Sequence, residues 1–138
     1  MQRRTLLAGA AALPAAAMVR PRRAAAAAIS DGVVKIGVLD DMSGVFADQQ
    51  GMGDYIAARM AAEDFGGKVL GAPIEVIQAD LQNKADVGLS IARHWFDEQQ
   101  VDAIFGLGNS AVALAVQDVC REKRKVDVVI AAGTTDLT

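Results

Sequence analysis

Small and hydroxylated residues suited to holding an anion gather in two segments, "GLGNSA" at 106–111 and "AAGTTDLT" at 131–138. Neither segment contains Lys or Arg. We expect Ser110 to open a helix, whose free N–H groups and positive dipole end favour a negative charge. The Thr134 hydroxyl can donate or accept a hydrogen bond. The two segments therefore predict an anion site made of main-chain amides and hydroxyls, although Ser110 acting only as a helix cap is a plainer and compatible interpretation.

The first of these turns also has a loose dinucleotide-binding pattern, Gly106-x-Gly108-x-x-Ala111. Such a turn belongs after the first strand, with an acidic residue about twenty positions on at the end of the second strand. Here the turn follows the third predicted strand, and Asp127, which has about the right offset, begins the fourth. An exported nicotinamide-dependent oxidoreductase with Gly106–Ala111 as its dinucleotide turn is therefore the alternative hypothesis.

The other chemistry-bearing side chains form no catalytic or metal-binding pattern. No serine lies in a G-x-S-x-G turn, and His94 falls inside a predicted helix beside Trp95, where we expect a surface or interface position. Cys120 and His94 are single residues of their types, too few for a zinc or copper site. Asp40 and Asp41 point to opposite faces of a strand, so we expect one to cap the next turn and the other to face solvent. We predict no catalytic residue, no metal, no cofactor and no enzymatic activity.

Residues 1–28 have the features of a secretory signal peptide. Arg3 and Arg4 precede an apolar run from Leu6 to Val19 that is too short to span a bilayer, and a basic "RPRR" and an A-x-A exit follow. The paired arginines before two leucines favour the twin-arginine route. We predict cleavage near Ala26 to Ala28 and a periplasmic location for the remainder, with a disordered Ala-rich leader or a membrane anchor as the alternative.

The charge of the chain differs between the leader and the rest. The whole sequence carries 14 Lys and Arg and 17 Asp and Glu, and five of the arginines but no acidic residue lie in residues 1–28. Residues 29–138 therefore have 9 basic and 17 acidic side chains, a net charge of −8. Such a surface repels phosphate backbones, so we expect no nucleic-acid partner.

Strands and helices that would position the two turns alternate along the rest of the chain. The apolar runs that predict strands are Val33–Leu39, Pro73–Ala79, Val101–Leu107 and Val126–Ala132. Helical patterns at about 51–65, from Asn83 and from Ser110 separate them. This alternation predicts a Rossmann-like α/β fold, a parallel sheet with helices on both faces. Ligands bind such sheets outside the carboxyl ends of the strands, where both turns would lie.

Each predicted helix has an apolar stripe that should face the sheet. Gly66 and Gly67 end the first helix, Asn83 is the expected N-cap of the second, and the basic "REKRK" closes the third. The residues predicted to face inward are Met52, Ile56, Met60 and Ala61 in the first helix, Val87, Ile91 and Trp95 in the second, and Ala111, Leu114, Ala115 and Val119 in the third.

Four stretches in order resemble one known family. They are "VKIGVLDDMSGVFADQQGMG", "AAEDFGGKVLGAPIEVIQADLQNKAD", "VDAIFGLGNSAVALAV" and "AAGTTDLT". Together they resemble the periplasmic substrate-binding proteins of ABC importers, in particular the branched-chain amino-acid (leucine/isoleucine/valine) binding family. The resemblance implies a type I periplasmic-binding fold of two lobes that close on a solute. Residues 29–138 would form the N-terminal part of such a protein, with the second lobe missing.

The resemblance also implies where a solute is held. The family binds the solute's carboxylate in two turns of the first lobe, and Phe46 and Asp48 fall where it shapes the side-chain pocket. The positions that match the two turns are Asn109, Ser110, Ala111, Ala131, Ala132, Gly133 and Thr134. A hydroxyl near Gly133 and an aromatic residue near Gln49, frequent in amino-acid binders of the family, are missing, so an amino acid, an amide and an aromatic acid all stay open.

Partners follow from the same resemblance. A protein of this kind captures a small solute in the periplasm and passes it to ABC permease subunits in the inner membrane, without a cofactor. A two-lobed sensor or receptor ectodomain of the same fold is a third hypothesis, which a downstream transmembrane segment would favour.

Overall fold

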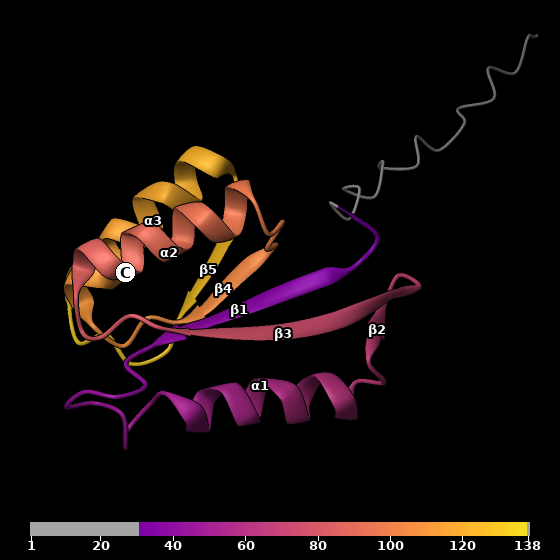
Figure 1. The fold of residues 1–138 in the computed structure, drawn as a ribbon, viewed down its shortest axis with the longest axis horizontal. Coiled ribbons are helices and arrows are strands. Elements are labelled where there is room, and N and C mark those ends of the chain that lie inside the picture. The colour runs from indigo at the N-terminus through magenta and orange to yellow at the C-terminus, as the bar shows by residue number, and fades with distance from the viewer. Residues whose placement is uncertain (1–30, 138) are drawn as a thin grey trace, which may run out of the picture.

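A computed structural model describes residues 31–137, which form one sheet with helices on both faces (Figure 1). The elements are β1 (Val34–Asp40), α1 (Met52–Asp64), β2 (Lys68–Val69), β3 (Ala72–Asp80), α2 (Ala85–Asp97), β4 (Ala103–Gly106), α3 (Ser110–Lys123), β5 (Val126–Val129) and the 3-10 turn η1 (Thr135–Leu137). The strands lie in the order β2-β3-β1-β4-β5. All neighbours run parallel except β2, which is antiparallel to β3. The predicted Rossmann-like α/β fold is confirmed.

The short strand β2 and the length of β5 were not predicted. Leu70 and Gly71 both have positive φ, which suits a two-residue hairpin loop, and this turn pairs Lys68 and Val69 with the start of β3. β5 ends at Val129 instead of Ala132 because β4, its one neighbour within residues 31–137, is four residues long. The carboxyl end of β5 therefore lies three residues earlier in the sequence than the end of the apolar run.

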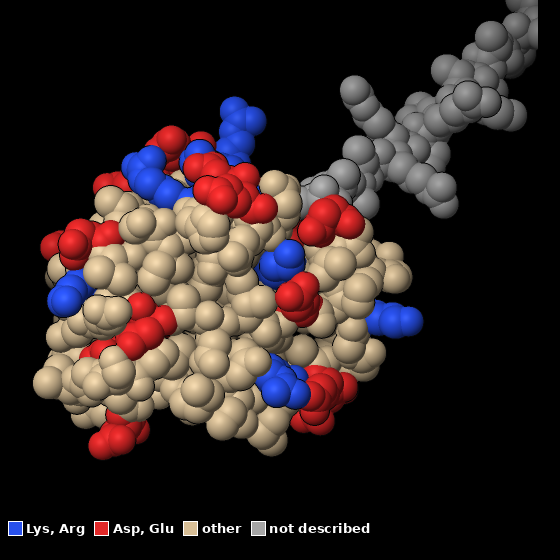
Figure 2. Space-filling view, in the orientation of Figure 1, with Lys and Arg blue, Asp and Glu red and all other residues tan. Residues whose placement is uncertain are grey.

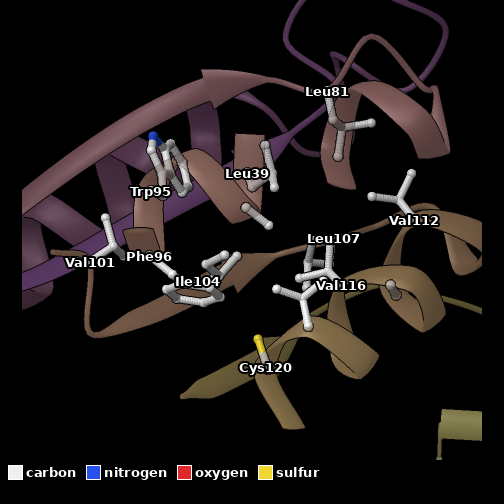
Figure 3. Close-up of a cluster of buried hydrophobic side chains, with 13 residues drawn as sticks. Leu39, Leu81, Trp95, Phe96, Val101, Ile104, Leu107, Val112, Val116 and Cys120 are labelled. Carbon is white, nitrogen blue, oxygen red and sulfur yellow. The ribbon is translucent and has the colours of Figure 1, made fainter. Parts of the chain in front are cut away.

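The main core lies between the sheet and the pair α2 and α3 (Figure 3). Leu39 and Ile104 from the sheet meet Trp95 and Phe96 from α2 and Val116 from α3, all of them buried. Gly37 of β1 allows this packing, because a Cβ there would overlap the indole ring of Trp95. Burial of these side chains supplies the main driving force for folding of residues 31–137.

The other face of the sheet carries only α1 among the described residues, and its packing differs from the prediction. Met52, Ile56 and Met60 were expected to face inward, yet they are 48%, 50% and 59% exposed. The half-buried residues of α1 are Asp54, Tyr55, Ala58 and Ala62, and Ala61, also expected to face inward, is exposed. A helix that lies over a strand through alanines can approach it closely, and the larger apolar residues are then turned outward.

The inward faces of the other two helices are also rotated from the prediction. Trp95 and Val119 are buried as expected. The buried residues are Gly88, Ala92, Trp95 and Phe96 in α2 and Val112, Ala113, Val116, Val119 and Cys120 in α3. Ala111 is exposed, while Val87, Leu114 and Ala115 are half-buried, as is Ile91, which packs on the core. Contact between α2 and α3 decides which side of each helix faces the core. Gly88 has no side chain, so Val112 of α3 can pack directly against α2 at this point.

Charged side chains of both signs are spread over the surface of the described residues. On the face shown in Figure 2, Lys and Arg side chains are scattered among Asp and Glu and do not form a basic patch. None of the helices within residues 31–137 is long and apolar enough to cross a membrane. The predicted signal peptide at 1–28 lies outside the described residues.

Candidate functional site

The carboxyl ends of β1 and β4 form the point where the chain changes direction across the sheet. From β1 the chain passes to β3 on one side, and β4 then lies on the other side of β1. Leu39 of β1 is in register with Gly106 of β4, so the loops that follow both strands begin side by side. Crevices at such a switch point are where open α/β sheets bind ligands. This edge is the candidate functional site.

The loop after β4 ends at the N-terminus of α3. Ser110 is the first helical residue, as predicted, but the cap is Asn109, whose side-chain oxygen accepts hydrogen bonds from the N–H groups of Ala111 at 2.8 Å and Val112 at 3.1 Å. Ser110 is half-buried, and its N–H and hydroxyl form no hydrogen bond with other residues in the described range. The anion-binding groups of this helix end are therefore fewer than the sequence predicts: Ser110 keeps its donors, whereas Ala111 has used its N–H.

Asn109 also connects two loops of the edge. Its side-chain amide donates a short hydrogen bond to the side-chain oxygen of Asn83, in the loop after β3. The prediction that Asn83 caps α2 is wrong, because the N-cap is Lys84 and makes no side-chain capping bond. Asn83 has a left-handed backbone with φ of 53° and turns its side chain toward the neighbouring loop instead. Sequence spacing could not show this partner, which comes from a different strand.

The second predicted turn lies beside the first. The N–H of Ile130 donates to the carbonyl oxygen of Gly106 at 2.9 Å, which ties the start of the β5 loop to the end of β4. Ala131 and Gly133 are exposed, and Ala132 is half-buried against the core. Thr134 is half-buried, and its hydroxyl oxygen accepts from the N–H of Asp136 at 3.2 Å, so its hydroxyl proton remains available for another acceptor. The structure thus brings the two predicted turns together at one edge.

The loop after β1 is held by two carboxylates. Asp41, which is buried, accepts from the N–H groups of Gly44 at 2.9 Å and Phe46 at 3.1 Å, as expected for the turn-capping member of the Asp40–Asp41 pair. Asp80 accepts from the Ser43 hydroxyl at 2.6 Å and the Met42 N–H at 3.0 Å. Burial alone would raise the pKa of Asp80, but these hydrogen bonds outweigh it and hold that pKa below its usual value.

The two predicted pocket residues of this loop stand apart from the turns. Phe46 is 36% exposed and Asp48 is exposed. Among the hydrogen bonds of residues 31–137, none joins either side chain to the turns at 106–111 or 131–134. They share the carboxyl edge of the sheet with those turns but do not form one hydrogen-bonded site with them.

Two buried polar side chains that the sequence did not single out as site residues lie under the β4 turn. Asp40 is completely buried, so the prediction that one of the two aspartates faces solvent is wrong. Its Oδ1 accepts from the N–H of Gly108 at 3.2 Å. Gln50, also buried, lies against Gly108. The glycines are the signal: a Cβ at Gly106 would overlap the Asp40 carboxyl, and one at Gly108 would overlap the Gln50 amide.

These contacts argue against the dinucleotide interpretation of the turn. In a dinucleotide fold the glycines let the backbone approach a pyrophosphate. Here the space that Gly106 and Gly108 leave is filled by Asp40 and Gln50 of the same chain.

Residues singled out for metal or catalytic chemistry lie away from this edge. His94 is exposed on α2 and lies 3.2 Å from a Glu98 carboxylate oxygen. Cys120 is buried in the core, and burial together with the nearby Asp127 raises the pKa of its thiol to about 12. Residues 31–137 contain no cluster of three His, Cys, Asp or Glu side chains that could hold a metal ion.

Comparisons with known proteins agree with this geometry. A family model described as "Periplasmic binding protein" matches residues 33–138. No curated protein matches the chain. A periplasmic binding protein from Burkholderia mallei is 51% identical with a TM-score of 0.75, over 77% of this chain and 28% of that one. A branched chain amino acid ABC transporter periplasmic ligand-binding protein from Burkholderia xenovorans is 50% identical with a TM-score of 0.71, over 73% and 27%.

A more distant solved structure comes with a bound acid. The solute binding protein of an ABC transporter from Rhodopseudomonas palustris, in complex with 3,4-dihydroxy benzoic acid, is 28% identical with a TM-score of 0.68. The match covers 76% of this chain and 29% of that protein. This chain therefore spans less than a third of the length of these solved proteins.

Proposed function

Because the chain belongs to the periplasmic binding protein family, we propose that it is the solute-binding component of an ABC importer. It captures a small solute with a carboxylate or amide group, such as an amino acid, an amide or an aromatic acid, in the periplasm. It then delivers the solute to permease subunits in the inner membrane. The proteins that the comparisons describe as amino-acid or aromatic-acid binders support this range of solutes.

The observation that carries the proposal is the pairing of two turns with free donors at the switch point of the sheet. Ser110 offers a free N–H and a hydroxyl at the N-terminus of α3, where the helix dipole favours an anion. Thr134 adds a hydroxyl from the adjacent β5 loop. We assign the carboxylate of the solute to these two residues, with the backbone of Asn109, Ala111 and Ala131–Gly133 forming the walls.

The remaining contacts are assigned to the β1 loop and to a second lobe. Phe46, which is partly exposed at the same edge, would cover the apolar part of the solute, and Asp48 would lie at its rim. Since the chain spans less than a third of its solved relatives, we propose that residues 29–138 are part of a first lobe. Closure of a second lobe over this edge would then complete the site and exclude water.

Export completes the proposal. Arg3 and Arg4 would direct the chain to the twin-arginine pathway, with removal of residues 1–28. Replacement of both arginines by lysine should abolish periplasmic accumulation, measured by cell fractionation. Accumulation at the level of the unaltered chain would exclude this route.

The test of the binding site is calorimetric titration with a panel of amino acids, amides and aromatic acids. For the solute that binds, Ser110→Ala and Thr134→Ala should each weaken affinity about tenfold to hundredfold, because a hydrogen bond to a charged group contributes ~1.5–3 kcal/mol. Ser90→Ala, which removes an exposed hydroxyl from α2, is the matched control and should leave affinity unchanged. If both Ser110→Ala and Thr134→Ala bind within about twofold of the unaltered chain, the carboxylate lies elsewhere.

A further inference from the structure

One carboxyl group at the functional edge lacks the partners that an ionised carboxylate needs. Asp40 is 0% exposed, and its Oδ1 accepts a single hydrogen bond, from the Gly108 N–H. Its Oδ2 is buried and has no hydrogen-bond donor among the described residues. A buried charged oxygen without a donor is costly, because it loses its hydration without compensation.

The groups that face Asp40 make a negative charge on it still less favourable. Asp54, in the first turn of α1, adds a negative charge that repels a charge on the Asp40 carboxyl. The neighbouring Asp41 and Asp80 are also acidic, and their carboxylates are occupied by loop N–H groups. Within residues 31–137, no Lys, Arg or His forms an ion pair with Asp40. The Gln50 side chain and the β4 turn add no positive charge.

We propose that Asp40 carries a proton in the native fold and that this neutral carboxyl positions the β4 turn for an anionic solute. The proton is taken from solvent and is not passed to the solute. Asp40 is thus a positioning residue, which acts through the Gly108 N–H on the turn that ends at Ser110. The effect on solute affinity rests on the proposed function, whereas the proton and its effect on the turn do not.

The physical consequence is that the ability of the β4 turn to hold an anion depends on pH. Burial, with the negative charge of Asp54 added and the Gly108 N–H opposing, raises the pKa of Asp40 to about 7. Below that pH the carboxyl is neutral, so its buried Oδ2 no longer carries a charge that lacks a donor. Above it a second negative charge lies directly behind the turn, where it repels a bound carboxylate and must do without a donor on Oδ2.

The proton itself is tested by NMR titration of the full chain with ¹³C-labelled aspartate. The Asp40 carboxyl resonance should titrate near neutral pH, and the Gly108 amide resonance should follow the same curve, because Gly108 donates to Asp40. Asp54→Asn should lower the midpoint for Asp40, whereas Asp86→Asn, which changes an exposed acid in the first turn of α2, should leave it unchanged. A midpoint for Asp40 near 4, the ordinary value, would overturn the proposal.

The effect on binding is measured with benzoate, an anionic probe across the range from about pH 5.5 to about 8.5. Its affinity for the unaltered chain should fall about tenfold or more over this range, and that of Asp40→Asn, whose amide mimics the protonated carboxyl, should change less than about twofold. Equal pH dependence in the two proteins would overturn the positioning role. If benzoate does not bind at any pH, the positioning role for this anion is overturned, and the NMR titration still decides whether Asp40 holds the proton and moves the turn.

Discussion

The two faces of the sheet differ in how completely they are packed. On one face α2 and α3 lie side by side, and Trp95 and Val116 are almost fully buried between them and the strands. On the other face α1 leaves Phe65, Val128 and Ile130 more than 40% exposed. Hollows of about 250 and 260 Å³ lie between α1 and the sheet, where Phe105 and Ala61 line both. Among residues 31–137, stability resides on the α2–α3 face, whereas the α1 face contributes less apolar burial and adds the negative charge of Asp54 near the buried Asp40.

The largest loss in the free energy of unfolding should come from removing a large buried side chain on the α2–α3 face. Trp95→Ala should reduce the free energy of unfolding by about 3–5 kcal/mol, because it leaves a cavity beside Gly37 that the sheet cannot close. Phe65→Ala, at the 67% exposed end of α1, is the matched aromatic control and should cost less than about 1 kcal/mol. Urea denaturation of both variants measures the difference. Equal losses would mean that the two faces are packed alike.

The buried carboxyl of Asp40 should make the stability of the fold depend on pH. The pKa of Asp40 is raised by burial and by Asp54 to about 7, so the native state binds a proton that the unfolded state releases near 4. The stabilising contribution is therefore full below about pH 4 and is lost as pH rises to about 7, a total of about 2–4 kcal/mol. Asp80 has the opposite sign: its pKa is lowered, so its contribution is present above its unfolded pKa and is lost as pH falls.

The measurement is urea unfolding at a series of pH values. Asp40→Asn should remove the decline between about pH 4 and 7 and leave any loss at lower pH in place. A decline that persists unchanged in Asp40→Asn would assign it to another group.

A smaller effect is expected where α3 begins. Asn109→Ala removes the side-chain oxygen that caps Ala111 and Val112 together with the bond to Asn83, and should cost about 1–2 kcal/mol. Asn83→Ala removes only the bond between the loops and leaves the cap, so its cost should be clearly smaller. Chemical denaturation of the two variants separates the contribution of the helix cap from that of the hydrogen bond between the loops. If the two variants lose the same stability, the cap contributes nothing beyond the link.

The smallest effect should come from the outward side of α1. Met60→Ala changes a side chain that is 59% exposed and should shift the free energy of unfolding by no more than about 0.5 kcal/mol. Val116→Ala on α3 is the buried aliphatic comparison and should cost about 2 kcal/mol or more. A large loss for Met60→Ala in denaturation would show that another segment covers α1 in solution.

The predicted inward sides of the helices show what a sequence pattern cannot determine. In α3 apolar residues surround most of the helix, so Ala111 and Leu114 were as acceptable inward as Val112 and Val116. In α1 the largest apolar side chains were assigned to the interior, yet the helix approaches the sheet through alanines. Periodicity reports which residues could be buried, whereas the neighbouring element decides which of them are.

The sequence by itself determined the alternation of strands and helices, the parallel sheet and the position of the two turns at its carboxyl edge. It did so because these features depend on local periodicity and on small residues that follow apolar runs. Only the tertiary structure decided that Asn109 rather than Ser110 caps α3, that Asn83 reaches across to it, and that Asp40 is buried beneath Gly106 and Gly108. The contacts of Asn83 and Asp40 join residues from different strands or loops, and the pairing of such segments is set by how the sheet is assembled, not by the spacing of residues along the chain. The cap is a local contact, and the sequence left it open because Asn and Ser are both favoured at that position.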